Sequence, residues 1–459
     1  MPAHPIDFIL QSQVFSTPEL MEIFDENSRF QRWLKFEAAL AEVQAELGII
    51  PPEAASEIKR KANINNLDLE KIKREYTQSR NSLIPVLKAL RLACEKDHGE
   101  YVHFGATTQD VLDTGYVLEL QDTFAVLSRD LEKLIKVLVT LARRHRDTPM
   151  AGRTHSQQAL PITFGLKAAI WLSEMLRHRE RLYSLQSRVL VGQLGGAVGT
   201  QAALGRHAFA VAQKTMEKLG LGHSSAPWHT ARDNMAEVAC VFALLSGTLA
   251  KICNEIFQLG KTEIAELREP AAPGKAISSS TMPHKRNPVL CERVAALNTH
   301  VRSLQTVVLE GMLHENERDP RALWSEWLAL PQISIYTGTA LGYTLKILEG
   351  LEVFPRQMLR NLHLHKEAIA SEWLLFQLAK KLGKMKAQEE LDRIIKEADL
   401  KGTSIKESLL ADQTLGALLR SFDLSMLDTP EMYTGQAGNI VDRIIAEAQT
   451  SAAETGKQN

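Results

Sequence analysis

Residues 113–144 read DTGYVLELQDTFAVLSRDLEKLIKVLVTLARR, and this stretch decides the fold class. Its apolar residues recur at alternating spacings of three and four: Val117, Leu120, Phe124, Leu127, Leu131, Leu134, Leu138 and Leu141. This is the period of a long helix with one apolar seam. Asp113 and Thr114 are suited to cap its start, and Pro149 limits its extension. The pattern predicts a helix that packs in a bundle.

The rest of the chain also favours long helices. No proline occurs between residues 161 and 227, 227 and 270, or 288 and 320, and these intervals are rich in good helix formers. Strands with period-two alternation are nearly absent, so we predict an all-α fold with at most small hairpins near the bundle ends. We place an N-terminal helical domain at 1–112, a central long-helix bundle at 113–350 and a smaller helical domain at 351–459. The length of the helices also predicts oligomerisation, because their apolar stripes need more partners than one chain supplies.

Composition excludes several classes of function. The chain has 459 residues and 54 basic against 55 acidic side chains, so no global field recruits nucleic acid or an anionic membrane. The N-terminus does not resemble a signal peptide and no uninterrupted apolar run approaches membrane-spanning length, which predicts a cytoplasmic protein. The 14 histidines form no His-Glu-x-x-His motif or tight histidine/cysteine cluster, and the glycines of 192–199 lack a phosphate-loop pattern. We therefore expect no metal and no cofactor.

The segment 270–288 has the composition of an anion-binding loop. Four prolines, Gly274 and three consecutive serines exclude regular structure from it. Lys275, Lys285 and Arg286 add positive charge, and the hydroxyls add hydrogen-bond donors suited to carboxylate or phosphate. A solvated linker has the same composition, so the residues alone leave both interpretations open.

Three motifs in sequence order carry a resemblance to a known family. The loop contains SSTMPHKRNPV at 279–289, the segment YVHFGATTQD lies at 101–110, and GRTHSQ lies at 152–157. Together they resemble the signature regions of the fumarase/aspartase superfamily, in its cycloisomerase and adenylosuccinate lyase branches. The resemblance implies a three-domain helical fold, a homotetramer with each active site shared by three subunits, and a reaction without cofactor. The substrate partner would be a small polycarboxylate.

The resemblance also implies roles for individual residues. Ser279 would be the catalytic base, and Lys285 and Asn287 would grip the substrate carboxylate. His155 would act as general acid toward the leaving group, polarised by Glu292. A histidine suits that task because its pKa lies near neutrality. Further substrate-binding candidates come from the other matching segments, namely His103, Thr107, Thr108, Gln109, Thr154, Asn81, Ser82 and Arg318.

The branch is predicted from local sequence. Asn81-Ser82 and the segment 320–327 lack the nucleotide-recognition residues of adenylosuccinate lyases and look like 3-carboxy-cis,cis-muconate cycloisomerase, which is our first expectation. Some bacterial cycloisomerases have lost the histidine and its partner glutamate, whereas this chain keeps His155 and Glu292. A lyase that releases fumarate from a substituted succinate is therefore the alternative, followed by adenylosuccinate lyase itself. A catalytically silent structural homologue is a further alternative.

Overall fold

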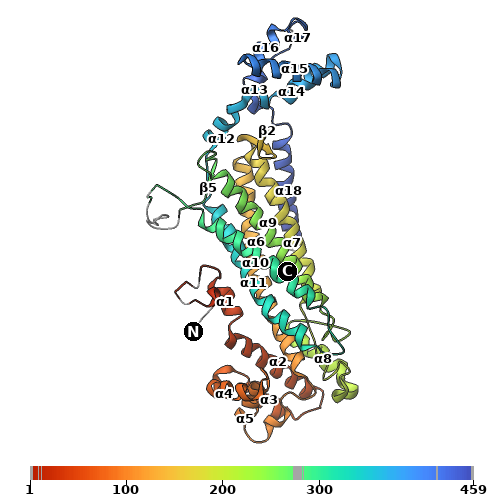
Figure 1. Cartoon of the computed structure of the whole chain (residues 1–459). Helices are drawn as coiled ribbons and strands as arrows, with labels where there is room; N and C mark the ends of the chain where they lie inside the picture. The colour runs from red at the N-terminus through yellow and green to blue at the C-terminus, as the bar shows by residue number, and fades with distance from the viewer. Residues whose placement is uncertain are drawn as a thin grey trace. The chain divides into compact units, whose positions relative to one another are not determined.

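Helices make up most of the chain, as the sequence predicts (Figure 1). The structure is a computed structural model that describes residues 4–8, 10–11, 13–271, 282, 284–419 and 422–455. The chain divides into two compact units. The first consists of Met1–Glu132, His178–Lys251 and Glu292–Thr344, and the second of Lys133–Arg177, Ile252–Cys291 and Leu345–Asn459. The three-domain division of the sequence analysis stays a prediction.

Five long helices contribute residues to both units: α6 (Thr108–Arg144), α7 (Phe164–Val189), α9 (Asp233–Leu259), α10 (Val289–Glu310) and α11 (Pro320–Glu349). Within the first unit, Phe124 of α6 packs edge-on against Phe242 of α9, with ring centroids 5.6 Å apart. His178 of α7 lies 2.8 Å from the Thr248 hydroxyl of α9. Seven of the eight predicted seam residues, all except Leu141, are buried. The three-four periodicity therefore identifies a packing face.

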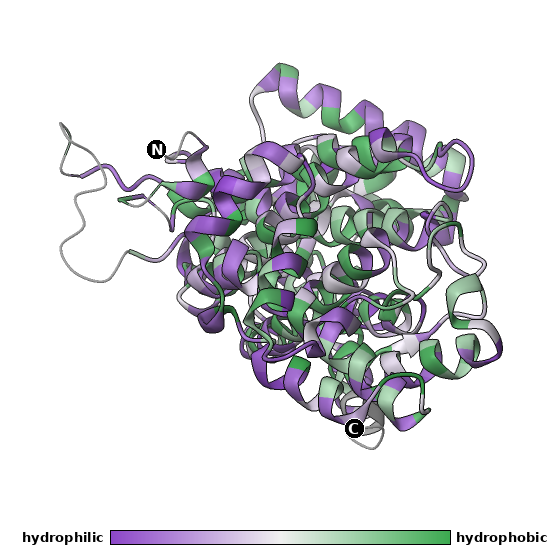
Figure 2. Cartoon of the chain, turned by 90° about the horizontal axis from the view of Figure 1, so that it is seen from below, coloured by the Kyte–Doolittle hydropathy of each residue, from purple (hydrophilic) through white to green (hydrophobic). Residues whose placement is uncertain are grey.

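Shorter elements complete the first unit. They are α1 (Pro18–Ile23), α2 (Glu26–Glu46), α3 (Pro52–Lys61), α4 (Leu69–Ser79), α5 (Ile84–Ala93), α8 (Ala208–Leu219), β3 (Val191–Gly192) and β4 (Gly222–His223). Several helix starts follow from local chemistry, because Thr17, Asp25 and Asp68 accept backbone N–H groups of the first turn of α1, α2 and α4. Hydrophobic and hydrophilic residues follow one another along the helical ribbons of the chain (Figure 2), as one buried and one exposed face require.

The second unit contains a β-hairpin and a group of short helices. Its strands are β1 (Pro149–Thr154), β2 (Gln157–Thr163), β5 (Leu267–Arg268) and β6 (Glu352–Val353). Its helices are α12 (Pro355–Leu362), α13 (Lys366–Ile369), α14 (Ser371–Leu382), α15 (Lys384–Lys401), α16 (Ile405–Ala411), α17 (Gln413–Leu419) and α18 (Ala437–Thr455). Helices α14 to α17 share a core of buried leucines that includes Leu374, Leu391 and Leu415.

One expectation about α6 is wrong. Asp113 and Thr114 do not cap the helix, because α6 begins five residues earlier, at Thr108. Both side chains are buried inside the helix and bond to other elements: Asp113 pairs with Arg232, and the Thr114 hydroxyl bonds to the backbone of Gln193. Residues typical of caps serve tertiary contacts here, and local sequence does not separate the two uses.

Among the described helices, α9 alone is long and apolar enough by composition to cross a membrane. The sequence analysis found no uninterrupted run because Glu237 and Lys251 interrupt it. In the structure, 61% of its most apolar window is buried, and Phe242, Leu245 and Leu249 are fully buried. Helix α9 is packed as a core helix.

Candidate active site

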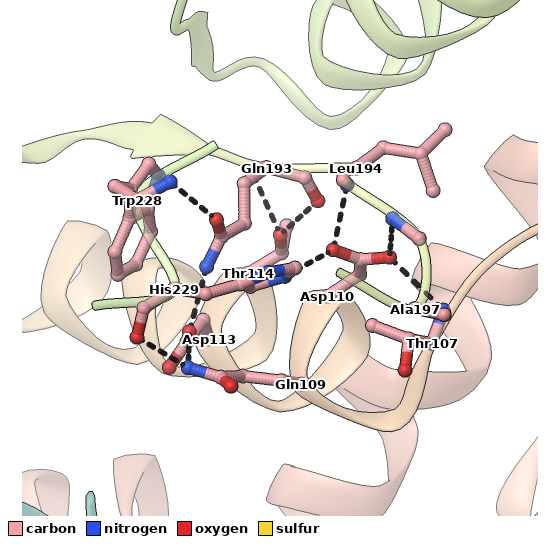
Figure 3. Close-up of polar contacts among 12 residues, drawn as sticks. Thr107, Gln109, Asp110, Asp113, Thr114, Gln193, Leu194, Ala197, Trp228 and His229 are labelled. Atoms are coloured by element: carbon pink, nitrogen blue, oxygen red, sulfur yellow. Dashed lines mark hydrogen bonds and ion pairs between the residues drawn. The ribbon is translucent and has the colours of Figure 1, made fainter. Parts of the chain in front are cut away.

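Asp110, in the first turn of α6, joins three segments of the first unit that are distant in sequence (Figure 3). Its Oδ1 accepts the Gly195 N–H at 2.7 Å and lies 2.8 Å from His229 Nε2. Its Oδ2 accepts the N–H groups of Thr107 at 2.9 Å and Gly196 at 3.0 Å. A Cβ at Gly195 would lie 2.9 Å from the His229 ring, so only glycine fits this approach.

Gln109 sets the orientation of Arg318. The side chain of Gln109 is 2% exposed, and its Nε2 donates to the His229 carbonyl at 2.8 Å and to Asp113 Oδ2 at 3.1 Å. Its Oε1 accepts from Arg318 Nε at 3.0 Å, and Arg318 Nη2 donates to the Ala197 carbonyl at 2.8 Å. Both polar ends of Gln109 are thus engaged within the protein, and the guanidinium of Arg318 is fixed at the edge of the network.

Thr107 and Thr108 lie where α6 begins, and both are half-buried. The first turn of a helix has backbone N–H groups without intrahelical acceptors, and the helix dipole adds partial positive charge there. The Thr107 N–H already donates to Asp110, but the two threonine hydroxyls and the Thr108 N–H, with the Arg318 guanidinium fixed through Gln109, are suited to an anion such as a carboxylate. The sequence-predicted grouping of Thr107, Thr108 and Arg318 in one region is observed in the first unit.

Behind this region, Arg232 bridges two buried carboxylates. Its Nη1 donates to Asp113 Oδ2 at 2.9 Å, and its Nε donates to Glu326 Oε2 at 2.9 Å. All three side chains are at most 2% exposed. Burial alone would lower the pKa of the Arg232 guanidinium, but the two carboxylates outweigh it and raise that pKa. The three charges form a fixed buried unit beneath the start of α6.

His103 is held by a buried carboxylate that the sequence analysis did not single out. Its backbone has a φ of 65°, and Glu37 of α2 accepts its N–H at 2.9 Å while also lying 2.7 Å from its Nδ1. Glu37 is 1% exposed. Burial lowers the pKa of the His103 imidazole, but the charge and hydrogen bond of Glu37 outweigh it, so the net pKa is raised. The His103 imidazole therefore keeps its proton to a higher pH than an ordinary histidine, which suits a hydrogen-bond donor to an anionic substrate.

The Glu37→Gln substitution should lower the pKa of His103 and change the pH dependence of stability. A raised folded-state pKa stabilises the protein fully below the ordinary histidine pKa of about 6.5, and that stabilisation is lost as pH rises through the raised value. The unfolding free energy of wild type minus that of Glu37→Gln should therefore be largest in mild acid and shrink with rising pH. Denaturant titrations at a series of pH values measure this difference. A pH-independent difference would refute the charge pairing.

Asn81 and Ser82 lie at the start of α5 in the same unit. The Asn81 Oδ1 accepts the N–H groups of Leu83 and Ile84, both at 3.0 Å, so this side chain closes the turn that leads into the helix. Ser82 is half-buried and lines a cavity. Their proposed contact with substrate stays a prediction, and the turn contact of Asn81 is a structural role that was not predicted from the sequence.

His155 lies at the tip of the β1–β2 hairpin in the second unit. Thr154 pairs with Gln157, and the two turn residues, His155 and Ser156, have φ values of 51° and 63°. Two left-handed residues in succession are typical of a type I′ hairpin turn, which normally favours glycine or asparagine. His155 and Thr154 are both exposed. A tight turn therefore presents the predicted general acid to its surroundings.

Glu266 anchors this hairpin. It is fully buried and accepts two hydrogen bonds from Arg153, at 2.9 and 2.6 Å. It also accepts from Asn361 Nδ2 at 2.8 Å. A bidentate pair of this kind fixes the arginine and the strand that carries it. Arg153 therefore serves the geometry of the hairpin, one residue before Thr154.

The signature loop is only partly within the described residues. Ser279, the predicted base, lies outside them, while Lys285 is exposed and Asn287 is half-buried in the second unit. Glu269 accepts the backbone N–H groups of Leu290 and Cys291, each at 3.0 Å, and so satisfies the start of α10. Glu292 lies in the first turn of that helix and is exposed.

The structure thus groups the candidates by unit. His103, Thr107, Thr108, Gln109, Arg318, Asn81, Ser82 and Glu292 belong to the first unit, and Thr154, His155, Lys285 and Asn287 belong to the second. Five acidic side chains that organise these regions were not predicted from the sequence. Glu37, Glu266 and Glu326 hold basic side chains, whereas Asp110 and Glu269 accept backbone N–H groups. A signal existed for Glu37 and Glu326, because each occupies an apolar position in the period of its helix. A buried charge needs a partner, so such positions point to ion pairs.

Three comparisons with known proteins bear on these groups. A family model described as lyase matches residues 13–302. The chain is similar to N-acetyl-S-(2-succino)cysteine lyase of Dickeya dadantii (strain 3937), with 40% identity over 98% of both chains. It is 39% identical to adenylosuccinate lyase of Methanothermobacter thermautotrophicus, over 98% of this chain and 99% of the relative. The solved structure of 3-carboxy-cis,cis-muconate lactonizing enzyme from Pseudomonas putida, 37% identical, matches with a TM-score of 0.89 over 95% of this chain and 98% of that one.

Proposed function

Because this chain belongs to the fumarase/aspartase superfamily and is an enzyme of the lyase type, we propose that it releases fumarate from a substituted succinate. The leaving group is a thiol or amine on carbon 2. The observation that carries the proposal is His155, held at an exposed hairpin tip by a turn with two left-handed residues. Elimination of a poor leaving group needs such an acid.

The proposed reaction is a β-elimination. Ser279 removes a proton from carbon 3, and the charge moves onto the adjacent carboxylate, where Lys285 and Asn287 stabilise it. The bond between carbon 2 and the heteroatom then breaks with its electron pair, and His155 gives the departing thiolate or amine a proton. Fumarate and the free thiol or amine result. The other carboxylate binds near the start of α6 and Arg318, where donors and positive charge gather in the first unit.

Similarity to a succinocysteine lyase supports a thioether substrate. N-acetyl-S-(2-succino)cysteine carries the succinyl group that the proposed carboxylate sites would hold, and its thiolate needs protonation. In the segment 320–327 the Arg321 guanidinium is already paired with Asp319 and Glu315, so a nucleotide substrate is less favoured. The second candidate is cycloisomerisation of 3-carboxy-cis,cis-muconate, our first expectation from sequence, and the high TM-score to a lactonizing enzyme favours it.

We further propose that the chain acts as a homotetramer whose sites combine residues from several subunits. Thr154 and His155 are exposed at the hairpin tip, and this supports the proposal. An exposed general acid can act when residues of another subunit complete a substrate site around it. The cytoplasmic location and the reaction without a cofactor stay predictions.

The proposal is tested with purified protein and two substrates. We expect wild type to form fumarate from N-acetyl-S-(2-succino)cysteine, measured by ultraviolet absorbance, and to leave 3-carboxy-cis,cis-muconate unchanged. Ser279→Ala should lower kcat by about 10²–10⁴-fold, the usual contribution of a positioned base. Consumption of the muconate alone would establish the second candidate. Inertness toward both substrates would favour the catalytically silent homologue.

A further inference from the structure

A cavity of about 620 Å³ lies within the first unit, lined by residues of α2, α4, α6 and α11. Six of its sixteen lining residues are aromatic: Phe24, Phe30, Trp33, Tyr76, Tyr116 and Trp327. The volume falls within the usual range for small-molecule sites, about 300–1,000 Å³, and an apolar lining with a few polar groups is typical of them. The proposed reaction assigns no part of the substrate to this cavity.

The cavity adjoins the candidate active site through two residues. Ser82, a predicted substrate-binding residue, is part of its wall. Leu112 is another part, and it lies four residues after Thr108 on α6. Residues four apart share one face of a helix and are separated by about one turn, roughly 5–6 Å. A group that extends about one helical turn from a substrate bound beside Thr108 therefore reaches the cavity.

The charges around the cavity favour an uncharged occupant. Arg29 is paired with Glu119 through two hydrogen bonds of 2.8 and 3.0 Å, so its charge is already balanced. The remaining charged lining residues, Glu26, Glu70 and Lys73, are exposed and of both signs. Burial, reinforced by the charge of Glu119, raises the pKa of the Tyr116 phenol well above its ordinary value, so this wall is also neutral.

We propose that this cavity is a subsite for an apolar, preferably aromatic, substituent on the leaving group of a substituted succinate. The inference rests on the proposed function and adds the chemical class of the departing thiol or amine. Stacking on Trp327 and Tyr76 supplies attraction that a small alkyl group cannot use. Such binding of a remote group raises kcat/KM for the substrate that carries it.

Two substrates of similar leaving-group chemistry test the subsite, 2-(benzylthio)succinate and 2-(methylthio)succinate. The benzyl ring extends about one helical turn from the sulfur, which matches the step from Thr108 to Leu112. Wild type should show a kcat/KM for the benzyl substrate about tenfold or more above that for the methyl substrate. Trp327→Ala should remove this preference and leave the methyl substrate unaffected.

The chain offers a matched control on the same helix. Trp324 is 57% exposed and is not among the residues that line the cavity, so Trp324→Ala should keep the benzyl preference. Tyr76→Ala serves as a second variant, because Tyr76 is 51% exposed on α4 and its loss should not unfold the protein. Trp327→Phe should restore most of the preference, which a merely structural role would not predict.

Binding of indole, which has no carboxylate, separates failure of the subsite from failure of the proposed function. Calorimetry should detect indole in wild type and in Trp324→Ala, and weaker binding in Trp327→Ala. If wild type eliminates both thioethers with the same kcat/KM, the subsite is refuted and the proposed function is retained. Indole binding without elimination of either thioether would overturn the proposed function, and with it the assignment of the cavity to a leaving group.

Discussion

An Arg232→Met variant is expected to lose about 3–5 kcal/mol of unfolding free energy, because it leaves two buried carboxylates without a partner. Asp113 and Glu326 are each at most 2% exposed and take their charge compensation from this guanidinium. Burial raises the pKa of the Glu326 carboxyl, and Arg232 opposes that rise. Without the arginine, at least one of the two carboxyls should take up a proton at neutral pH. Denaturant unfolding measures the loss.

Arg188 provides the control for that measurement. It makes the same kind of two-point contact with Glu237, but the two side chains are 52% and 36% exposed. Arg188→Met should cost no more than about 1 kcal/mol, the usual limit for an exposed pair. Adding Asp113→Asn and Glu326→Gln to Arg232→Met should recover part of the lost stability. Equal losses for Arg188→Met and Arg232→Met would contradict the role of burial.

A His155→Asn variant is expected to reduce kcat by about 10²–10⁴-fold with an alkylthiol leaving group, as removal of a positioned general acid should. Asparagine suits the test because it tolerates the left-handed backbone that His155 adopts. The loss should shrink as the leaving thiol becomes more acidic, since an acidic thiol departs as the thiolate without help. Steady-state kinetics with alkyl and aryl thioethers of succinate measure this dependence.

The neighbouring turn residue controls for damage to the hairpin. Ser156 has a φ of 63° in the same turn, so Ser156→Asn changes the turn without removing the imidazole. Its kcat should stay within a few fold of wild type. A loss in His155→Asn that is the same for alkyl and aryl leaving groups would sink the general-acid assignment. It would point to a role of His155 in binding or in the shape of the hairpin.

Periodicity predicted the fold class because burial follows a fixed rule along a helix. The seam from Val117 to Leu138 is buried, and α6 ends at Arg144, before Pro149, as the sequence indicates. The start of α6 was misplaced because Asp113 and Thr114 have side chains that suit both a cap and a buried contact. Only tertiary partners decide between these uses, and Arg232 is 119 residues from Asp113.

For a similar reason, the sequence predicted some residues of the candidate site and not others. Motifs identified the groups suited to touch a substrate, such as His103, His155 and Arg318. The residues that position these segments lie far away in the sequence. Glu37 holds His103 from 66 residues away, and Glu266 holds Arg153, in the hairpin that carries His155, from 113 residues away. Their pairing depends on the fold, and no spacing rule in the sequence expresses it.

The contacts of Asp110 also determine when the first-unit part of the site can form during folding. Its partners Gly195, Gly196 and His229 are 85, 86 and 119 residues away. Closing loops of that size costs entropy before any contact compensates for it, and long-range contacts slow folding. A fragment must span at least residues 107–229 to contain every partner in this network. A nascent chain therefore forms the Asp110 contacts at the start of α6 only after residue 229 has left the ribosome.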